Sequence, residues 1–369
     1  FLPQARASEG VTFLTEKRDI WEFLPGPMTR HVGWQFALHL LERGANGQAT
    51  SVFDTIINPP RVGKFNRGAV KLPPPPPYDL TDACSLLWRM DIWGVETGED
   101  RWRGVAEAFT HYANVRHLST FLDVHAVMAF AAMAFGAVDP TERLFWRDKA
   151  ESMMKSMREY VRTRAGTLQE HTGGDDDSNS SSVAPLGYDP DKPRPLFEGR
   201  ELPPETMELH SFPIQRYKNR RPVPPTLEWG GGESGAEGAG EEGGVPDNLW
   251  VAQHLGLPLC EALYSYRGEE FEKAVSILLG IRYHLNELGG SKAQQDVIHI
   301  TLIDAALRLP EKAIGRALVC ERHQARPSSG RAWQAYSTML DQMGYVDQAY
   351  QAKLMAHHWG IGQGGFGGG

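Results

Sequence analysis

Six polar side chains carry most of the chemistry that the sequence offers, in three pairs along the chain: His31 with Gln35, Asp123 with His125, and Asp296 with His299. His31 and Gln35 share a helix face, but an amide is a poor zinc ligand, so no metal site is predicted. If the helices that carry the three pairs converge, the six side chains would line a small-molecule pocket.

The alternative for each pair is a structural role. Asp123 is expected to cap the N-terminus of the helix that contains His125. Asp296 and His299 stand three residues apart in an apolar helix, where a buried, mutually satisfied pair is the commoner outcome. A ligand contact at these positions is the minority interpretation.

A glycine turn before a helix, Gly289-Gly290-Ser291-x-x-Gln294, invites comparison with a phosphate-binding loop. It lacks the Lys-Ser/Thr ending of such a loop. The sequence instead predicts that one glycine ends a helix in the left-handed conformation and that Ser291 and Gln294 form the capping box of the next helix.

Motifs for covalent or cofactor chemistry are absent from the sequence, including Gly-x-Ser-x-Gly, His-Glu-x-x-His, Cys-x-x-Cys and a dinucleotide fingerprint. The three cysteines, Cys84, Cys260 and Cys320, suit a reducing compartment better than a disulfide framework. We therefore predict no catalytic residues, metal or cofactor, and an enzyme is the less favoured class. We therefore expect the protein to be intracellular. The cytoplasm is the favoured compartment, and an organelle is the alternative.

Nearly all of the remaining chain has the apolar periodicity of helices. The predicted helices are Met28–Arg43, Gln48–Ile57, Leu80–Trp93, Asp100–Asn114, Val124–Phe135, Thr141–Arg164, Asn248–Tyr266, Glu269–Leu288, Lys292–Leu309, Glu311–Ala325, Gly330–Met343 and Val346–His358. Short turns join them, which favours stacked hairpins. The fold class is therefore all-α.

The last hairpin has the residue pattern of a tetratricopeptide (TPR) unit, in which small residues allow two helices to cross closely. With Trp333 as the opening aromatic residue, Ala349 and Ala356 occupy the two small positions. Less regular versions occur earlier in the chain. The sequence thus predicts a TPR-type α-solenoid.

Several strings also resemble the tetratricopeptide repeat protein 38 family. They are His31-Val32-Gly33-Trp34-Gln35-Phe36-Ala37-Leu38, Asp79-Leu80-Thr81-Asp82-Ala83-Cys84-Ser85-Leu86-Leu87-Trp88-Arg89, Phe121-Leu122-Asp123-Val124-His125-Ala126, Gly256-Leu257-Pro258-Leu259-Cys260 and Gly289-Gly290-Ser291-Lys292-Ala293-Gln294-Gln295-Asp296. Gln35 stands where that family has histidine. The resemblance implies a helical repeat fold and brings no established reaction.

The net charge of −8 comes from one segment, residues 166–246, which holds 15 acidic and 7 basic residues. Its many Gly, Pro and Ser residues predict a largely disordered or extended insertion. This insertion separates two sets of helical repeats, 28–165 (with a proline-rich loop at 58–78) and 247–359. An N-terminal extension at 1–27 and a glycine-rich tail at 360–369 complete the predicted organisation.

These features favour a non-catalytic scaffold for protein–protein interactions, a subunit or adaptor of a larger complex. Its partners would bind the solenoid surface, with the insertion as a second candidate binding segment. The alternative is a small-molecule-binding protein or an enzyme with a polar pocket inside the solenoid. The negative net charge disfavours nucleic acid as a partner, and no apolar run reaches the roughly 20 residues of a membrane span.

Overall fold

The computed structural model describes residues 6–24, 26–58, 76–112, 116–172 and 247–360. Within these ranges the chain is mostly helical and contains no β-strand, so the all-α prediction is confirmed. No helix in these ranges has the length and apolar character that crossing a membrane requires. The predicted insertion, most of the proline-rich loop and the end of the tail lie outside them.

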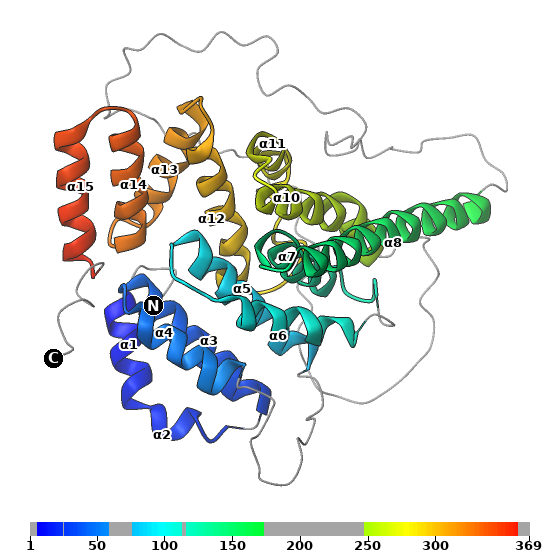
Figure 1. Ribbon diagram of the computed structural model, residues 1–369, viewed down its shortest axis with the longest axis horizontal. Helices are drawn as coiled ribbons and strands as arrows, with labels where there is room; N and C mark the ends of the chain where they lie inside the picture. Colours follow the sequence, from blue (N-terminus) through cyan, green and yellow to red (C-terminus); the bar gives the residue numbers. More distant parts are fainter. Residues whose placement is uncertain (1–5, 25, 59–75, 113–115, 173–246, 361–369) are drawn as a thin grey trace. The chain divides into compact units, whose positions relative to one another are not determined.

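The first part of the chain contains α1 (Ala7–Glu16), α2 (Arg18–Trp21), α3 (Gly26–Glu42), α4 (Asn46–Val52), the π-helix η2 (Phe53–Ile57), α5 (Pro77–Ile92), α6 (Glu99–Thr110), α7 (Thr120–Gly136) and α8 (Pro140–Thr172). The second part contains α9 (Asp247–Val251), the π-helix η4 (Ala252–Gly256), α10 (Leu257–Arg267), α11 (Phe271–Ile281), α12 (Lys292–Arg308), α13 (Ala313–Ala325), α14 (Gly330–Gln342) and α15 (Val346–His358). Figure 1 shows their arrangement.

Several predicted boundaries are wrong, and three of them change how the parts of the chain are understood. Residues 1–27 were expected to be an extension, but α1 packs on α3 and Trp21 is buried, its indole N–H donating to the carbonyl of Leu14 (2.7 Å). Helix α5 begins at Pro77, because proline fits the first turn of a helix, so Asp79 lies inside the helix. Helix α8 continues to Thr172, seven residues into the expected insertion.

Helix α5 lies at the centre of the packing, in contact with α3, α6, α7 and α12 (Figure 1). Every residue from Asp79 to Met90 is buried, although this stretch includes two aspartates and an arginine. A helix that is buried on all sides cannot leave its polar groups to water, so each needs a partner on a neighbouring helix. These partners form the polar clusters described below.

Hydrogen bonds give the direction of the helices beside α5. On α3 and α5, His31 pairs with Asp82 (2.8 Å) and Trp34 pairs with Ser85 (3.1 Å), so the residue numbers rise together and the two helices run parallel. The chain returns from the end of α3 to the start of α5 through α4 and η2, which pack on α3, so α3 is the first member of a hairpin; α6 follows α5 and packs on it.

The two hairpins at opposite ends of the chain also meet. The Arg331 side chain, on α14, donates to the carbonyl of Leu41 (3.0 Å) and to Asn46 (2.9 Å), which lie around the end of α3. Ser329 donates to the Glu42 carboxylate (2.8 Å) at the same place. The helices therefore make contacts beyond those between neighbours in the sequence.

The predicted capping box is confirmed. Gly289 and Gly290 have φ of 89° and 76°, the left-handed region that glycine tolerates. The Ser291 hydroxyl accepts from the backbone N–H of Gln294 (3.2 Å), and the Gln294 side-chain oxygen accepts from the backbone N–H of Ser291 (2.8 Å). The predicted small residues of the last hairpin, Ala349 and Ala356, are both buried where α15 packs on α14.

Candidate functional site

The first polar cluster, here called the Asp82 cluster, joins the beginnings of α3, α5 and α12. It consists of Arg30, His31, Asp79, Asp82 and Gln294. Arg30 pairs with Asp79 at 2.6 Å. The Asp82 carboxylate contacts His31 Nδ1 (2.8 Å) through one oxygen and the Gln294 side-chain N–H (2.9 Å) through the other. Both carboxylates are buried, and each faces a cationic or hydrogen-bonding partner.

The capping box fixes the orientation of the Gln294 amide, because its oxygen is already used by Ser291. The amide N–H therefore points to one oxygen of Asp82, and the His31 ring forms a hydrogen bond with the other oxygen. His31 also stacks on Trp34, with ring centroids 5.3 Å apart. The hydrogen bond with Asp82 raises the pKa of His31, whereas burial raises the pKa of Asp82. A histidine held in this way can accept a proton at Nε2 when Nδ1 donates to the aspartate.

The second cluster, here called the Asp296 cluster, joins the later part of α5 to α12 and α13. It consists of Arg89, Asp296, Arg322 and Arg326. The Asp296 carboxylate accepts two bonds from Arg322 (2.9 and 3.2 Å) and lies 3.1 Å from Arg326. Burial acts to raise the pKa of Asp296, but the charges of Arg322 and Arg326 outweigh it and lower the pKa well below its ordinary value.

This arrangement corrects the expected pairing of Asp296 with His299. The carboxylate faces α13 because two arginines one helical turn apart offer it three charge-assisted contacts. His299 is half-buried, and burial lowers its pKa. Gln35, the predicted partner of His31 on α3, is also half-buried.

The expected N-cap role of Asp123 is also wrong. Helix α7 begins at Thr120 with Ser119 at the N-cap, so Asp123 lies inside the helix. Its carboxylate instead accepts from the backbone N–H (3.1 Å) and from Nδ1 (3.1 Å) of His117, in the preceding turn. His117 has a positive φ of 63°, and the contacts with Asp123 stabilise this conformation.

His125 lies in the core. Its Nδ1 donates to the carbonyl of Phe121 (2.7 Å), and its ring packs on that of Phe121. Nε2 is buried and has no hydrogen-bond partner among the described residues. Burial lowers the pKa of His125 to about 4, so the imidazole is neutral at physiological pH. This environment fits a core histidine.

One cavity lies beside the Asp296 cluster, and a second lies between α1 and the last two helices. None of the six predicted polar residues lines either cavity. The first, here called the groove cavity, has a volume of about 210 Å³. Apolar side chains and two arginines line it, from α5, α12, α13 and α14: Ile92, Trp93, Ile300, Ile303, Leu307, Ala335, Arg322 and Arg331. Asp304, Gln334 and Thr338 complete its polar wall.

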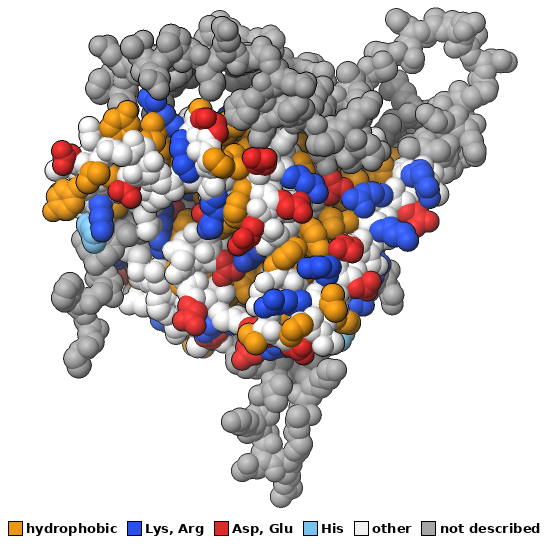
Figure 2. All heavy atoms as spheres, turned by 45° about the horizontal axis from the view of Figure 1, so that its top comes forward, with side chains coloured by type: hydrophobic (Ala, Val, Ile, Leu, Met, Phe, Trp, Pro, Cys, Tyr) orange, Lys and Arg blue, Asp and Glu red, His pale blue; other side chains and the backbone are white. Residues whose placement is uncertain are grey.

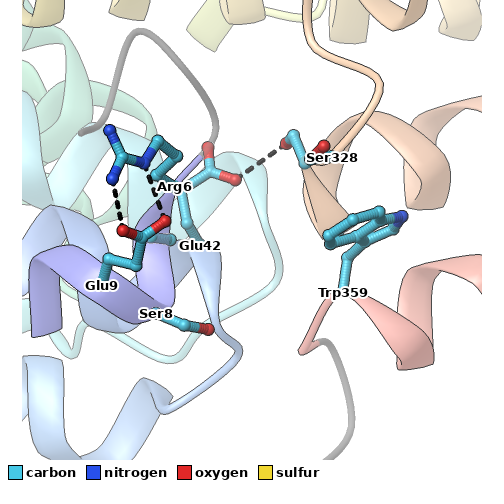
Figure 3. A pocket seen from close by; sticks show the side chains of 9 residues that line it. Arg6, Ser8, Glu9, Glu42, Ser328 and Trp359 are labelled. Carbon is cyan, nitrogen blue, oxygen red and sulfur yellow. Dashed lines mark hydrogen bonds and ion pairs between the residues drawn. The ribbon is translucent and has the colours of Figure 1, made fainter. Parts of the chain in front are cut away.

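The second cavity, about 260 Å³, lies between α1 and the last two helices (Figure 3). Its charged groups are paired within its own wall. Arg6 bonds to Glu9, and Glu42 accepts from Ser329 (2.8 Å). The Trp359 indole faces these groups across the cavity (Figure 3).

The arginines of the groove cavity did not stand out in the sequence. Arg322 and Arg326 have the i, i+4 spacing of a shared helix face, and Asp296 is acidic in an apolar helix. This combination is the only pattern in the sequence that hints at an ion pair between Asp296 and the two arginines. Using it requires knowing that α13 packs on α12. Arg331 gave no signal, because an arginine in the first turn of a helix is usually exposed.

The chain matches no known protein-family model and no solved structure.

Proposed function

We propose that the protein is a helical-repeat scaffold that binds a partner protein through the outer face of its last helix, α15. A scaffold of this type is what the sequence pattern and the resemblance to the tetratricopeptide repeat protein 38 family imply. The parallel α3 and α5, each the first helix of a hairpin, support the repeat architecture. The proposal itself rests on one observation, the apolar face of α15.

The face presents three apolar side chains at intervals of four residues, Val346, Tyr350 and Leu354, which are 64%, 59% and 45% exposed. In Figure 2 hydrophobic side chains gather along the edge of the molecule that α15 forms. On the opposite side of the same helix, Ala349, Ala352 and Ala356 are buried against α14. Helix α15 is thus apolar on two sides, and the described part of the chain covers only one.

Spacing of i, i+4 and i+8 is the pattern by which one helix packs along another. In a repeat protein the outer face of a hairpin is covered by the next hairpin, and a terminal repeat with a polar outer face ends the stack. The stripe spans about 12 Å at 1.5 Å per residue. The occupant that this surface fits is an amphipathic helix of a partner, with apolar residues at the same spacing.

Site-specific photocrosslinking in cells tests this proposal. A photoreactive residue replaces Tyr350, and in a matched control it replaces Lys155, an exposed position of α8. We expect one discrete protein to be crosslinked from position 350, with the linked peptide on an amphipathic helix. The product should disappear in the Leu354→Glu variant. Equal crosslinking from both positions, or a product that survives Leu354→Glu, would contradict the proposal.

A further inference from the structure

The arginines around the groove cavity outnumber the acids that could neutralise them. Arg331 is only 5% exposed, and its three hydrogen bonds go to neutral oxygens, those of Leu41, Asn46 and Gln334 (2.9–3.0 Å). No carboxylate of the described residues pairs with it. Burial lowers the pKa of Arg331 to about 10, which still leaves it charged at physiological pH.

Arg89 is in the same situation. It is 2% exposed, and its guanidinium donates to the backbone carbonyls of Ser85 (3.2 Å) and Ala293. The Asp296 carboxylate, whose charge also acts on Arg89, is already shared by Arg322 and Arg326. Across this region four guanidinium groups therefore face only two carboxylates, those of Asp296 and Glu42.

Other acids near the cavity are already engaged. Asp304, which lines it, accepts from the Tyr266 hydroxyl (2.6 Å) and from Arg308 (2.6 Å). Taking charges out of water is expensive unless opposite charges compensate them. A buried positive excess beside a cavity therefore favours an anion in that cavity.

The shape and lining of the cavity narrow the chemistry of that anion. Arg322 and Arg331 both line it, and each guanidinium retains N–H groups beyond those in the hydrogen bonds above. Most of the remaining wall is apolar, with Ile300, Ile303 and Leu307 on α12 and Trp93 at the end of α5. About 210 Å³ accommodates roughly seven water molecules at about 30 Å³ each, or a short apolar chain with one acidic group.

We propose that the groove cavity binds a carboxylate that carries an apolar substituent. The carboxylate lies against Arg322 and Arg331, and the apolar part lies against the aliphatic side chains of α12. The carboxylate belongs either to a small organic acid or to the C-terminus of a polypeptide. This site is independent of the α15 face, so either proposal can fail without the other.

Isothermal titration calorimetry on the full chain tests the site, with hexanoate as the probe and hexan-1-ol and hexylamine as controls. We expect saturable binding of hexanoate alone. Arg331→Met should weaken it at least about tenfold, since a charge-assisted hydrogen bond is lost. Arg101→Met is the matched control, because Arg101 is paired with Asp54 (2.8 Å) away from the cavity and the variant should bind hexanoate normally.

Arg331→Lys retains the charge and guards against misfolding of the Met variant; it should bind more tightly than Arg331→Met. A second arm compares a peptide ending in Ile-Leu carboxylate with its C-terminal amide. Tighter binding of the free-acid peptide than of hexanoate identifies a polypeptide source, and the reverse identifies a small acid. Equal binding of hexanoate and hexan-1-ol, no binding of any carboxylate, or unchanged affinity in Arg331→Met overturns the proposal.

Discussion

The Asp82 and Asp296 clusters lie at opposite ends of the same buried helix, α5, and differ in how their charges are balanced. In the Asp82 cluster two carboxylates face one arginine and a histidine that can be neutral. In the Asp296 cluster one carboxylate faces three arginines. The first cluster is complete within the chain, whereas the second carries positive charge that the described residues do not neutralise.

The two clusters show two kinds of buried polar group. One kind holds helices together, and the other is available to bind a ligand. Gln294 and His31 use both oxygens of Asp82, so this carboxylate has little capacity for another partner. Arg331 and Arg89 direct their hydrogen bonds to neutral oxygens, and the Arg331 guanidinium also lies over the Trp93 ring (4.7 Å), so neither forms an ion pair with a carboxylate of the described residues. Burial of a charged side chain does not by itself indicate a ligand-binding site. An excess of one sign of charge among neighbouring buried side chains does.

The largest predicted effect is that of Asp296→Ala. The substitution leaves Arg322 and Arg326, whose side chains are 9% and 18% exposed, without their counter-charge, and breaking a largely buried ion pair in this way costs about 3–5 kcal/mol. Urea denaturation followed by circular dichroism measures the free energy of unfolding. A loss below about 1 kcal/mol would show that solvent reaches the arginines and that the cluster is not buried as described.

Asp82→Asn should have a smaller effect, about 1–2 kcal/mol, because the amide keeps the shape and can still accept from Gln294. It should also return the pKa of His31 toward its ordinary value, since the hydrogen bond with Asp82 is the main cause of the raised pKa. NMR titration of the His31 ring protons checks this. A destabilisation as large as that of Asp296→Ala would remove the distinction between the clusters.

How far the sequence predicts such clusters depends on whether the partners lie close together in the chain. The capping box at Ser291 and Gln294 could be predicted because both residues lie within one turn, and the same holds for the limits of α12 and α15. The sequence also identified His31 as a polar residue of interest. Its partner Asp82 was not identified, because the two belong to different hairpins and nothing in their spacing predicts that α3 packs on α5.

The misplaced residues share one cause. Asp123 was predicted to cap its own helix and Asp296 to pair with His299, both local roles. Their carboxylates instead bind His117, which precedes α7, and two arginines at the end of α13. An acidic side chain in a buried helix pairs with the strongest hydrogen-bond donors within reach, and tertiary packing decides which donors those are.

Gln294→Ala addresses the link between the capping box and the Asp82 cluster. The substitution removes the bond to Asp82 and the side-chain bond to the Ser291 backbone N–H, for a loss of about 1 kcal/mol. In Asp82→Asn the remaining effect of Gln294→Ala should be smaller, since the shared hydrogen bond is already weakened. Strict additivity in this double-mutant cycle would mean that the two groups do not interact.

The smallest predicted effect is a dependence of stability on pH through His31. Its pKa is raised in the folded chain, so its pairing with Asp82 stabilises fully below the ordinary pKa of about 6.5, and this stabilisation is lost as the pH rises through the folded value. The side chain is 42% exposed, so solvent screens the pair and the shift in melting temperature between pH 6 and pH 8.5 should be about 1–2 °C. His31→Gln has no titratable group here and should lose this part of the pH dependence while retaining the rest. If the variant and the parent chain lose equal stability over this range, proton binding at His31 is not coupled to folding, and the Asp82 cluster does not depend on its charge.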